Sequence, residues 1–252
     1  MSLVLGLVGV LLLGPIGVIA SGEVDPRAAW WAGSRESTGQ APSPDEEPGA
    51  VVQVYAARTV GWRGAFGVHT WIATRRAGAA DWTVHQVIGW RVYRGAGAVV
   101  SQTGPPDARW FGAWPERLVD LRGDGVTATI DRIEAAVADY PWPDRYRAWP
   151  GPNSNTFTAF VARRVPELRL DLPPTAIGKD WLDGTVVDRT PSGTGWQVSV
   201  LGVLGVAVGR DEGVEVNLLG LSAGLDLDDA ALRVPGFGRV GAGYGSHAEP
   251  PR

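Results

Sequence analysis

The sequence contains no cysteine and only three histidines among its 252 residues. Without cysteine the protein has no thiolate nucleophile, no redox CxxC pair, no disulfide framework and no thiolate metal site. The charge balance also lacks a basic excess, because 23 Lys and Arg residues stand against 27 Asp and Glu residues, for a net charge of −4. A chain of this charge has no electrostatic footprint for nucleic acid, so we expect no nucleic-acid partner.

Tryptophan is abundant instead. The chain carries twelve tryptophans, and its length suits one domain with extensions or two small domains. Such indole rings could line a groove for an acyl chain or a glycan. Packing within the core is their commoner role, and we expect it for most of them.

The N-terminal segment, residues 1–20, is the clearest local signal. Leu3 to Ala20 is uncharged and almost wholly apolar, and as a helix it would be about 27 Å long, near the lower limit for crossing a bilayer. A cleaved signal segment is one interpretation, because Val18-Ile19-Ala20 is an acceptable cleavage site. We favour a transmembrane anchor, with the rest of the chain periplasmic or on the extracytoplasmic face of the inner membrane, and we expect export in either case.

Composition then divides the chain into three further parts. Residues 21–49 contain four prolines and an acidic run, which predicts a flexible linker. Residues 50–235 have the apolar patterning of a single folded domain. The glycine-rich residues 236–252 are expected to form a disordered tail.

Periodicity within the domain predicts the fold class. Runs rich in Val, Ile, Trp and Thr predict strands, and apolar residues at three-to-four spacing predict helices. The predicted strands are Val51–Thr59, Ala65–Thr74 and Trp82–Tyr93, the last two forming a hairpin around Gly78, and the predicted helices are Thr127–Tyr140 and Asn155–Val165. These elements indicate an α+β fold in which an antiparallel β-sheet packs with helices.

Residues 196–227 predict an extra β-hairpin, with strands over Gln197–Val208 and Val214–Leu225. Both strands are rich in Leu and Val and are unusually apolar for a surface. We expect a sheet that is buried on both faces. The alternative is an edge that faces a partner or a membrane.

Two of the three histidines lie on the arms of the first hairpin. A turn centred near residue 77 would place His69 opposite His85. Two facing imidazoles could act as a base and its orienting group, or as two metal ligands. A histidine on a strand is also commonly a hydrogen-bonded core residue. The third, His247, lies in the predicted tail.

A second candidate lies at the start of the second helix. Pro150-Gly151-Pro152 leads to Asn153-Ser154-Asn155, and Ser154 would stand where unpaired backbone N–H groups and the helix dipole stabilise negative charge. A nucleophile there would have an oxyanion-stabilising environment. Ser and Asn are also the preferred N-cap residues, so Asn153 or Ser154 could simply cap the helix.

The order of these parts resembles the circularly permuted papain-like hydrolases of the NlpC/P60 superfamily, including the lecithin:retinol acyltransferase-like and PPPDE peptidase families. There a strand-borne His precedes a nucleophilic Cys in an Asn-Cys-x-x-Phe-type motif at a helix start. The resemblance covers about residues 51–165 and implies a permuted papain-like core. It implies the following roles: His69 as general base, Ser154 in the nucleophile position, His85 or Gln86 as the orienting group, and Asn153, Asn155, Phe157 and Trp71 in support.

This resemblance implies a serine-type hydrolase or acyltransferase that acts on amide or ester bonds of a cell-envelope peptide or lipid, without a cofactor or metal. Where that family has a thiol, this chain has the hydroxyl of Ser154, which needs a correctly held base during attack. The alternative is a non-catalytic envelope module, used for binding or structure, in which replacement of Cys by Ser abolished activity.

Three longer stretches resemble the uncharacterised bacterial family DUF3750. They are Phe66 to Ile72 (FGVHTWI), Gly151 to Phe157 (GPNSNTF) and Asp171 to Trp181 (DLPPTAIGKDW). The family label implies no activity. The last stretch contains Lys179, the single lysine of the chain, which we expect to be a surface charge paired with Asp180 or Asp183.

Overall fold

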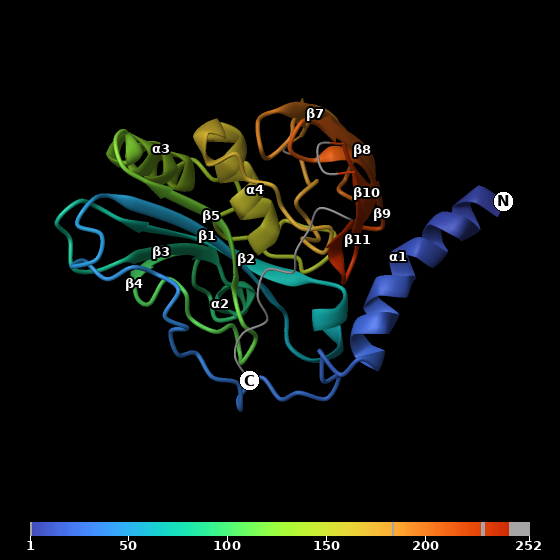
Figure 1. Ribbon diagram of the computed structural model, residues 1–252, viewed down its shortest axis with the longest axis horizontal. Helices are drawn as coiled ribbons and strands as arrows, with labels where there is room; N and C mark the ends of the chain where they lie inside the picture. The colour runs from blue at the N-terminus through green and yellow to red at the C-terminus, as the bar shows by residue number, and fades with distance from the viewer. Residues whose placement is uncertain (1, 183, 228–229, 242–252) are drawn as a thin grey trace.

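The computed structural model, which describes residues 2–182, 184–227 and 230–241, contains two antiparallel sheets flanked by helices (Figure 1). The first sheet has the strand order β4-β3-β2-β1-β5, and the second is a seven-stranded sheet in the order β12 to β6. The predicted α+β class, with an antiparallel sheet packed against helices, is confirmed.

The elements of the first half lie close to their predicted positions. The first sheet is built from β1 (Val51–Arg58), β2 (Val68–Arg75), β3 (Thr83–Val87), β4 (Val99–Thr103) and β5 (Glu116–Arg122). The helices are α1 (Ser2–Ala20), α2 (Gly89–Val92), α3 (Val126–Ala138) and α4 (Ser154–Arg164), with short 3-10 turns η1 (Gly61–Ala65) and η2 (Pro166–Leu168). The third predicted strand is too long, because the chain leaves β3 at Val87 and turns into α2.

Helices α3 and α4 cover one face of the first sheet. The α3 residues Ile130 and Ile133 are fully buried there against Val54 and Ile72 of the sheet and Phe157 of α4. A second cluster of buried residues lies on the opposite face, around Tyr55, Trp71 and Trp82. Both faces of this sheet are therefore packed, the second one largely by aromatic rings.

The prediction that His69 faces His85 is wrong. His85 pairs with Ile72, three residues further along β2 than expected. An odd displacement moves a residue to the other face of a sheet, because side chains alternate along a strand. The two imidazoles thus lie on opposite faces and cannot share a metal ion or act as base and orienting group. The predicted register is wrong because the turn between β2 and β3 is centred further along the chain than residue 77.

The second sheet takes the place of the single hairpin expected over residues 196–227. It consists of β6 (Val187–Arg189), β7 (Gly195–Val200), β8 (Leu204–Gly209), β9 (Gly213–Leu218), β10 (Leu221–Asp226), β11 (Ala231–Val234) and β12 (Gly238–Val240). Each predicted long strand is divided by a tight turn, at Leu201-Gly202 and at Leu219-Gly220. Both residues of each pair have positive φ, which reverses the chain direction.

The second sheet is also not buried on both faces. In β7 the polar residues Gln197 and Ser199 are buried, whereas Trp196, Val198 and Val200 are exposed. The same inversion continues through β8, in which Val206 and Val208 are exposed. The sheet turns its polar side toward the rest of the domain and its apolar side outward.

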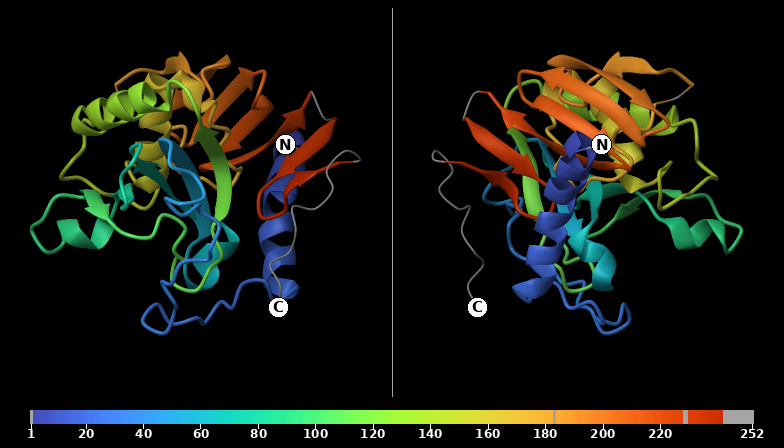
Figure 2. Two further views of the ribbon diagram at one scale, coloured as in Figure 1. Left: turned by 60° about the vertical axis from the view of Figure 1, so that its left-hand side comes forward. Right: turned by 90° about the vertical axis from the view of Figure 1, so that its right-hand side faces the viewer.

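Helix α1 packs beside the end of this second sheet (Figure 2). Gly14 and Gly17 allow close approach: a Cβ at Gly14 would lie on the carbonyl oxygen of Pro235, and one at Gly17 would lie 2.4 Å from the ring of Phe237. Within the described residues, no helix has both the length and the apolar character needed to cross a bilayer.

The predicted linker and tail differ from their expected forms. Residues 21–49 contain no helix or ladder strand, yet hydrogen bonds hold part of them against the domain. Of the predicted tail, residues 236–241 include β12, which pairs with β11. Residues 242–252, and with them His247, lie outside the described residues.

Candidate functional site

His69 lies within a stack of aromatic rings. Its imidazole is parallel to the indole of Trp110, with ring centroids 3.6 Å apart, and it also stacks on Trp71 at 5.7 Å. His69 Nε2 donates a hydrogen bond to Gln86 Oε1 at 2.9 Å. Because an amide oxygen only accepts, Nε2 carries the hydrogen and the lone pair is on Nδ1.

Burial determines the charge of this imidazole. The ring is almost completely covered, and removal from water lowers the pKa of His69 to about 4, although the hydrogen bond with Gln86 acts in the opposite direction. His69 is therefore neutral near pH 7. A base with so low a pKa has little driving force for proton abstraction at that pH.

Trp71 and Trp110, the two rings that stack on His69, also line a cavity of about 220 Å³. Its walls are three indoles, two guanidinium groups, several small residues and two glutamines. The lining residues are Arg35, Trp71, Val84, Gln86, Ile88, Trp90, Gln102, Gly104, Pro105, Ala108, Arg109 and Trp110. Trp90 stacks on Trp110 with centroids 5.9 Å apart, so the aromatic wall is continuous from β2 to α2.

The cavity is electropositive. Arg35 and Arg109 line it, and no acidic side chain is among its lining residues within the described structure. The Arg35 guanidinium lies over the ring of Phe111 at 4.1 Å, and Arg109 lies over Trp114 at 4.8 Å. These cation–π contacts hold both cations beside the opening. The site therefore combines flat apolar surfaces with fixed positive charge.

Part of the predicted linker forms this wall. The carboxylate of Asp107, which is fully buried, accepts hydrogen bonds from Ser37 Oγ at 2.7 Å and from the Gln40 backbone N–H at 2.6 Å. A short bridge also pairs Ser37 with Ala108. These contacts hold the chain around Arg35 on the domain, so this stretch is not a free tether. The composition of residues 21–49 does not reveal that Asp107, far away in the sequence, accepts hydrogen bonds from this segment.

Asn153 is the N-cap of α4. Its Oδ1 accepts from the backbone N–H groups of Asn155 and Thr156, and Thr156 Oγ1 accepts in return from the Asn153 backbone N–H, which completes a capping box. Asn153 Nδ2 further donates to the carbonyl oxygens of Ala148 and Ile177. Ser154 is the first helical residue, and Phe157 is fully buried in the core one turn later.

The first turn of α4 lies against β2 on either side of His69. Thr70 Oγ1 contacts the Ser154 carbonyl oxygen at 3.4 Å and Asn155 Oδ1 at 3.0 Å, while Asn155 Nδ2 donates to the Val68 carbonyl oxygen at 3.1 Å. The backbones of His69 and Ser154 are therefore neighbours. Within the described residues, however, no hydrogen bond joins the Ser154 hydroxyl to the imidazole.

His85 belongs to a different group. Its Nδ1 is 2.8 Å from Ser101 Oγ and its Nε2 is 3.2 Å from Thr74 Oγ1, on the side of the sheet that faces the helices. Burial lowers the pKa of His85 to about 4. Gln86, rather than His85, is the polar partner of His69.

Lys179 is not the surface charge that its sequence context suggests. Its buried ammonium lies 3.0 Å from Asp180 Oδ1 and 2.8 Å from Glu215 Oε2. Burial acts to lower the pKa of Lys179, but attraction by the two carboxylates outweighs it and raises the pKa above its usual value. Arg233 Nε lies 2.7 Å from Glu215 Oε1 and extends the network to Asp171.

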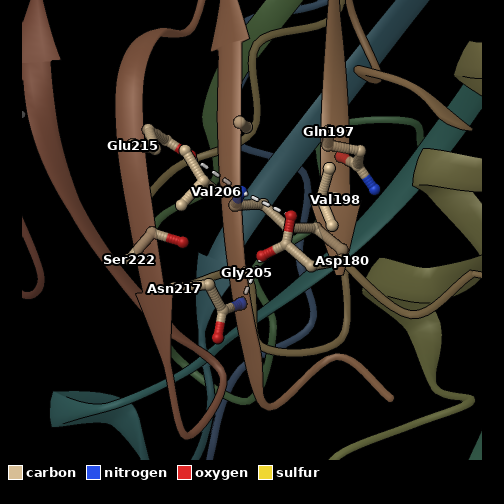
Figure 3. Close-up of a pocket in the computed structure, with 10 residues that line it drawn as sticks. Asp180, Gln197, Val198, Gly205, Val206, Glu215, Asn217 and Ser222 are labelled. Carbon is tan, nitrogen blue, oxygen red and sulfur yellow. Dashed lines mark hydrogen bonds and ion pairs between the residues drawn. The ribbon is translucent and has the colours of Figure 1, made fainter. Parts of the chain in front are cut away.

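This network lies under the polar face of the second sheet (Figure 3). Asn217 donates to Asp180, and Gln197 of β7 and Ser222 of β10 line the same space. Both amide atoms of Gln197 and the hydroxyl of Ser222 are buried without a hydrogen-bond partner in the described structure. Sequence reasoning missed this cluster, whose only signal is the polar residue at every second position of β7 and β9.

Comparison with known proteins assigns the family. Residues 49–181, more than half of the chain, match the model of a protein family of unknown function, DUF3750. The chain belongs to the DUF3750 family. The DUF3750 region contains the first sheet, Lys179 and every residue that lines the aromatic cavity except Arg35, and it ends before the second sheet. No curated protein and no solved structure matches the chain, so the papain-like resemblance stays a prediction.

Proposed function

We propose that this DUF3750 protein is a binding module, and that the aromatic cavity takes one ring of an acidic saccharide. The observation that carries the proposal is the cavity wall of Trp71, Trp90 and Trp110 with Arg35 and Arg109 beside it. Indoles offer flat apolar faces to the C–H face of a sugar ring. Guanidinium groups bind a carboxylate with charge-assisted hydrogen bonds.

The size of the cavity supports a single ring. At about 220 Å³ it is smaller than the roughly 300–1,000 Å³ of sites for drug-sized ligands. Gln86 and Gln102 add amide groups that can bind ring hydroxyls. The imidazole of His69 lies behind Trp110 and Trp71 and supports the wall, so its role in this proposal is structural.

Cell-envelope placement is part of the proposal. It is supported by the apolar, uncharged residues 3–20 and by the families that the chain resembles. A saccharide of the bacterial envelope that carries a carboxylate is N-acetylmuramic acid, and N-acetylglucosamine is a matched sugar without that carboxylate. We therefore use this pair as probes.

Calorimetric titration of the full chain with both sugars tests the proposal. We expect N-acetylmuramic acid to bind more tightly, and we expect Arg35→Gln to weaken only this sugar, by about tenfold, the loss of one charge-assisted contact. Trp90→Ala should weaken both sugars, and Trp62→Ala, which removes an exposed indole outside the cavity, should weaken neither. Equal affinity for the two sugars, or binding of benzoate in preference to both, would contradict an acidic-saccharide site.

A second candidate function is the serine-type hydrolase or acyltransferase. The position of Ser154 favours it, because Ser154 is the first residue of α4, where backbone N–H groups and the helix dipole stabilise negative charge, and this helix begins beside the backbone of β2. Three properties of His69 make it the weaker candidate. Its side chain stacks on Trp71, on the face of the first sheet opposite to the one that α4 covers. Its pKa is low, and its Nε2 is hydrogen-bonded to Gln86.

A fluorophosphonate probe tests the second candidate. Labelling of the wild type but not of Ser154→Ala or His69→Ala would support catalysis. Absence of labelling, together with saccharide binding that is unchanged in Ser154→Ala, would leave the binding module as the function.

A further inference from the structure

The outer face of the second sheet is apolar where a surface sheet is normally polar. Along β7 the exposed fractions alternate in the inverted sense: Trp196 is 55% exposed and Val198 51%, while Gln197 between them is 2% exposed. A polar residue gains from facing water and an apolar residue from leaving it. The alternation therefore predicts that the outer face meets an apolar phase.

The apolar surface continues from strand to strand. One outward row follows the strand register from β7 to β12 without a charged member: Trp196, Val208, Val214, Leu225, Leu232 and Val240. On the edge strand β6 the row ends at Arg189, whose guanidinium lies over the ring of Trp196 at 4.0 Å. The inward row beside it contains Glu215 and Arg233, which form the buried ion pair already described. The charges of β9 and β11 thus lie beneath the sheet, away from the outer face.

The turns at the two ends of the sheet also differ in polarity. Because the strands form an antiparallel meander, every second turn lies at the same end. The turns at one end present Leu201, Leu219 and Phe237 to solvent. At the other end the β8–β9 turn contains Arg210, Asp211 and Glu212. The described turns at the first end thus carry exposed apolar side chains, whereas the opposite end combines the charged β8–β9 turn with the exposed Leu227.

The leucines at the apolar end have an unfavourable backbone conformation. Leu201 has a φ of 52° and Leu219 a φ of 55°, in tight turns that favour Asn-Gly or Asp-Gly. The two residues are 66% and 60% exposed, so most of each leucine faces solvent. The two tips lie side by side, since the Leu219 N–H donates to the Val203 carbonyl oxygen at 2.6 Å. A strained and exposed leucine at both tips indicates a role outside the folded core.

Helix α1 extends this surface. It contacts β10 and β11 and packs its glycines on the β11–β12 turn, at the same end as the leucine tips (Figure 2). Leu12, Leu13 and Ile16 on its far side are exposed. The helix contains no charged residue.

We propose that the outer face of the second sheet binds a lipid surface, with Leu201 and Leu219 inserted among the acyl chains. Among the described residues, the outward side chains of β7 to β12 carry no charge, and Arg189 on the edge strand β6 is the charged group at the margin of the face. Lipid hydrocarbon therefore satisfies the centre of the face. The seven strands are three to six residues long and cover only about 550 Å², below the roughly 800 Å² per partner of a standard protein interface, which disfavours a second copy as the occupant. The proposal is independent of the aromatic cavity.

The absence of cysteine allows a site-specific test on the full chain. Leu219→Cys and Ala230→Cys each create a single attachment site for an environment-sensitive nitrobenzoxadiazole label. The two positions are matched, because both are exposed turn residues with positive φ, at opposite ends of the sheet. On addition of phosphatidylcholine vesicles we expect a severalfold rise and a blue shift in emission at position 219, and no change at position 230.

A second pair of variants separates insertion from folding. Asparagine tolerates positive φ better than leucine, so Leu201→Asn combined with Leu219→Asn should retain or raise the thermal stability. The same variant should bind vesicles severalfold more weakly, while Ala230→Asn should bind like the wild type.

Two results would overturn the proposal. The first is a label at Leu219 that responds to vesicles no more than the label at Ala230. The second is a change in its emission that depends on protein concentration without vesicles, which would show that a second copy covers the face.

Discussion

The indole of Trp110 lies parallel to the imidazole of His69, with 3.6 Å between the ring centroids and 14° between the ring planes. Trp110 therefore separates His69 from the cavity whose wall it forms. This arrangement makes the imidazole a neutral, buried support for a binding surface. As a consequence, the pKa of His69 depends on the presence of Trp110 in the cavity wall.

Removal of the indole tests that connection. In Trp110→Ala the imidazole gains access to water, so its desolvation decreases and the pKa of His69 should rise from about 4 toward 6.5. Titration of the imidazole signals by NMR measures this shift. Trp62→Ala is the control and should leave the pKa unchanged. A value that stays near 4 in Trp110→Ala would show that Trp110 does not shield His69.

The two buried histidines should make folding pH-dependent. Each has a native pKa of about 4 and an ordinary value of 6.5, so between these limits the unfolded chain binds more protons than the native protein. The free energy of unfolding should therefore fall as the pH falls from 6.5 to 4, by about 3 kcal/mol per histidine. Urea denaturation across this range measures the loss. His69→Gln and His85→Gln should each show a smaller loss, and an unchanged pH profile in both variants would contradict this account.

Lys179 should stabilise the junction between the two sheets. Lys179→Met leaves the buried carboxylates of Asp180 and Glu215 without their shared cation, and we expect a loss of about 3–5 kcal/mol in the free energy of unfolding. Chemical denaturation gives this value. Adding Asp180→Asn removes one unpaired charge and should recover part of the loss. If Lys179→Met were as stable as the wild type, the ammonium would not be buried as described.

Asp107 should hold the Arg35 segment in place. Asp107→Ala removes the acceptor for Ser37 and Gln40, so the segment should detach and tryptic cleavage after Arg35 should become faster. The affinity for an acidic saccharide should fall with it, because Arg35 lines the cavity. Asp45→Ala, in an exposed stretch of the same segment, is the matched control. Cleavage at the wild-type rate in Asp107→Ala would show that other contacts hold the segment.

Local features were predictable from the sequence. The helix over Ser154–Arg164 begins one residue before its predicted start, because Asn153 and Thr156 form a capping box within four residues. The strand Val51–Arg58 and the helix Val126–Ala138 follow in the same way from short-range periodicity. In each case the residues that determine the element are neighbours in the chain.

Long-range relationships were not predictable. A shift of three residues in the register of β2 and β3 separates His69 from His85, and a single sequence does not fix a register that depends on where a turn closes. The prediction that the second sheet is buried on both faces was wrong for a similar reason. Alternation of polar and apolar residues marks the two faces of a sheet but does not say which face is turned toward the core. That choice follows from Lys179, which pairs with its neighbour Asp180 and is buried because Glu215, from a distant part of the chain, also meets it.

The sequence by itself determined the absence of thiol chemistry, the α+β class, the cap of α4 and the family. Only the tertiary structure decided that Arg35, Trp90 and Trp110 form one cavity, that Gln86 is the partner of His69, and that the apolar side of the second sheet faces outward. The physical reason is the range of the interactions. Capping and periodicity act within a few residues, whereas stacking, ion pairing and burial join residues whose proximity depends on the whole fold.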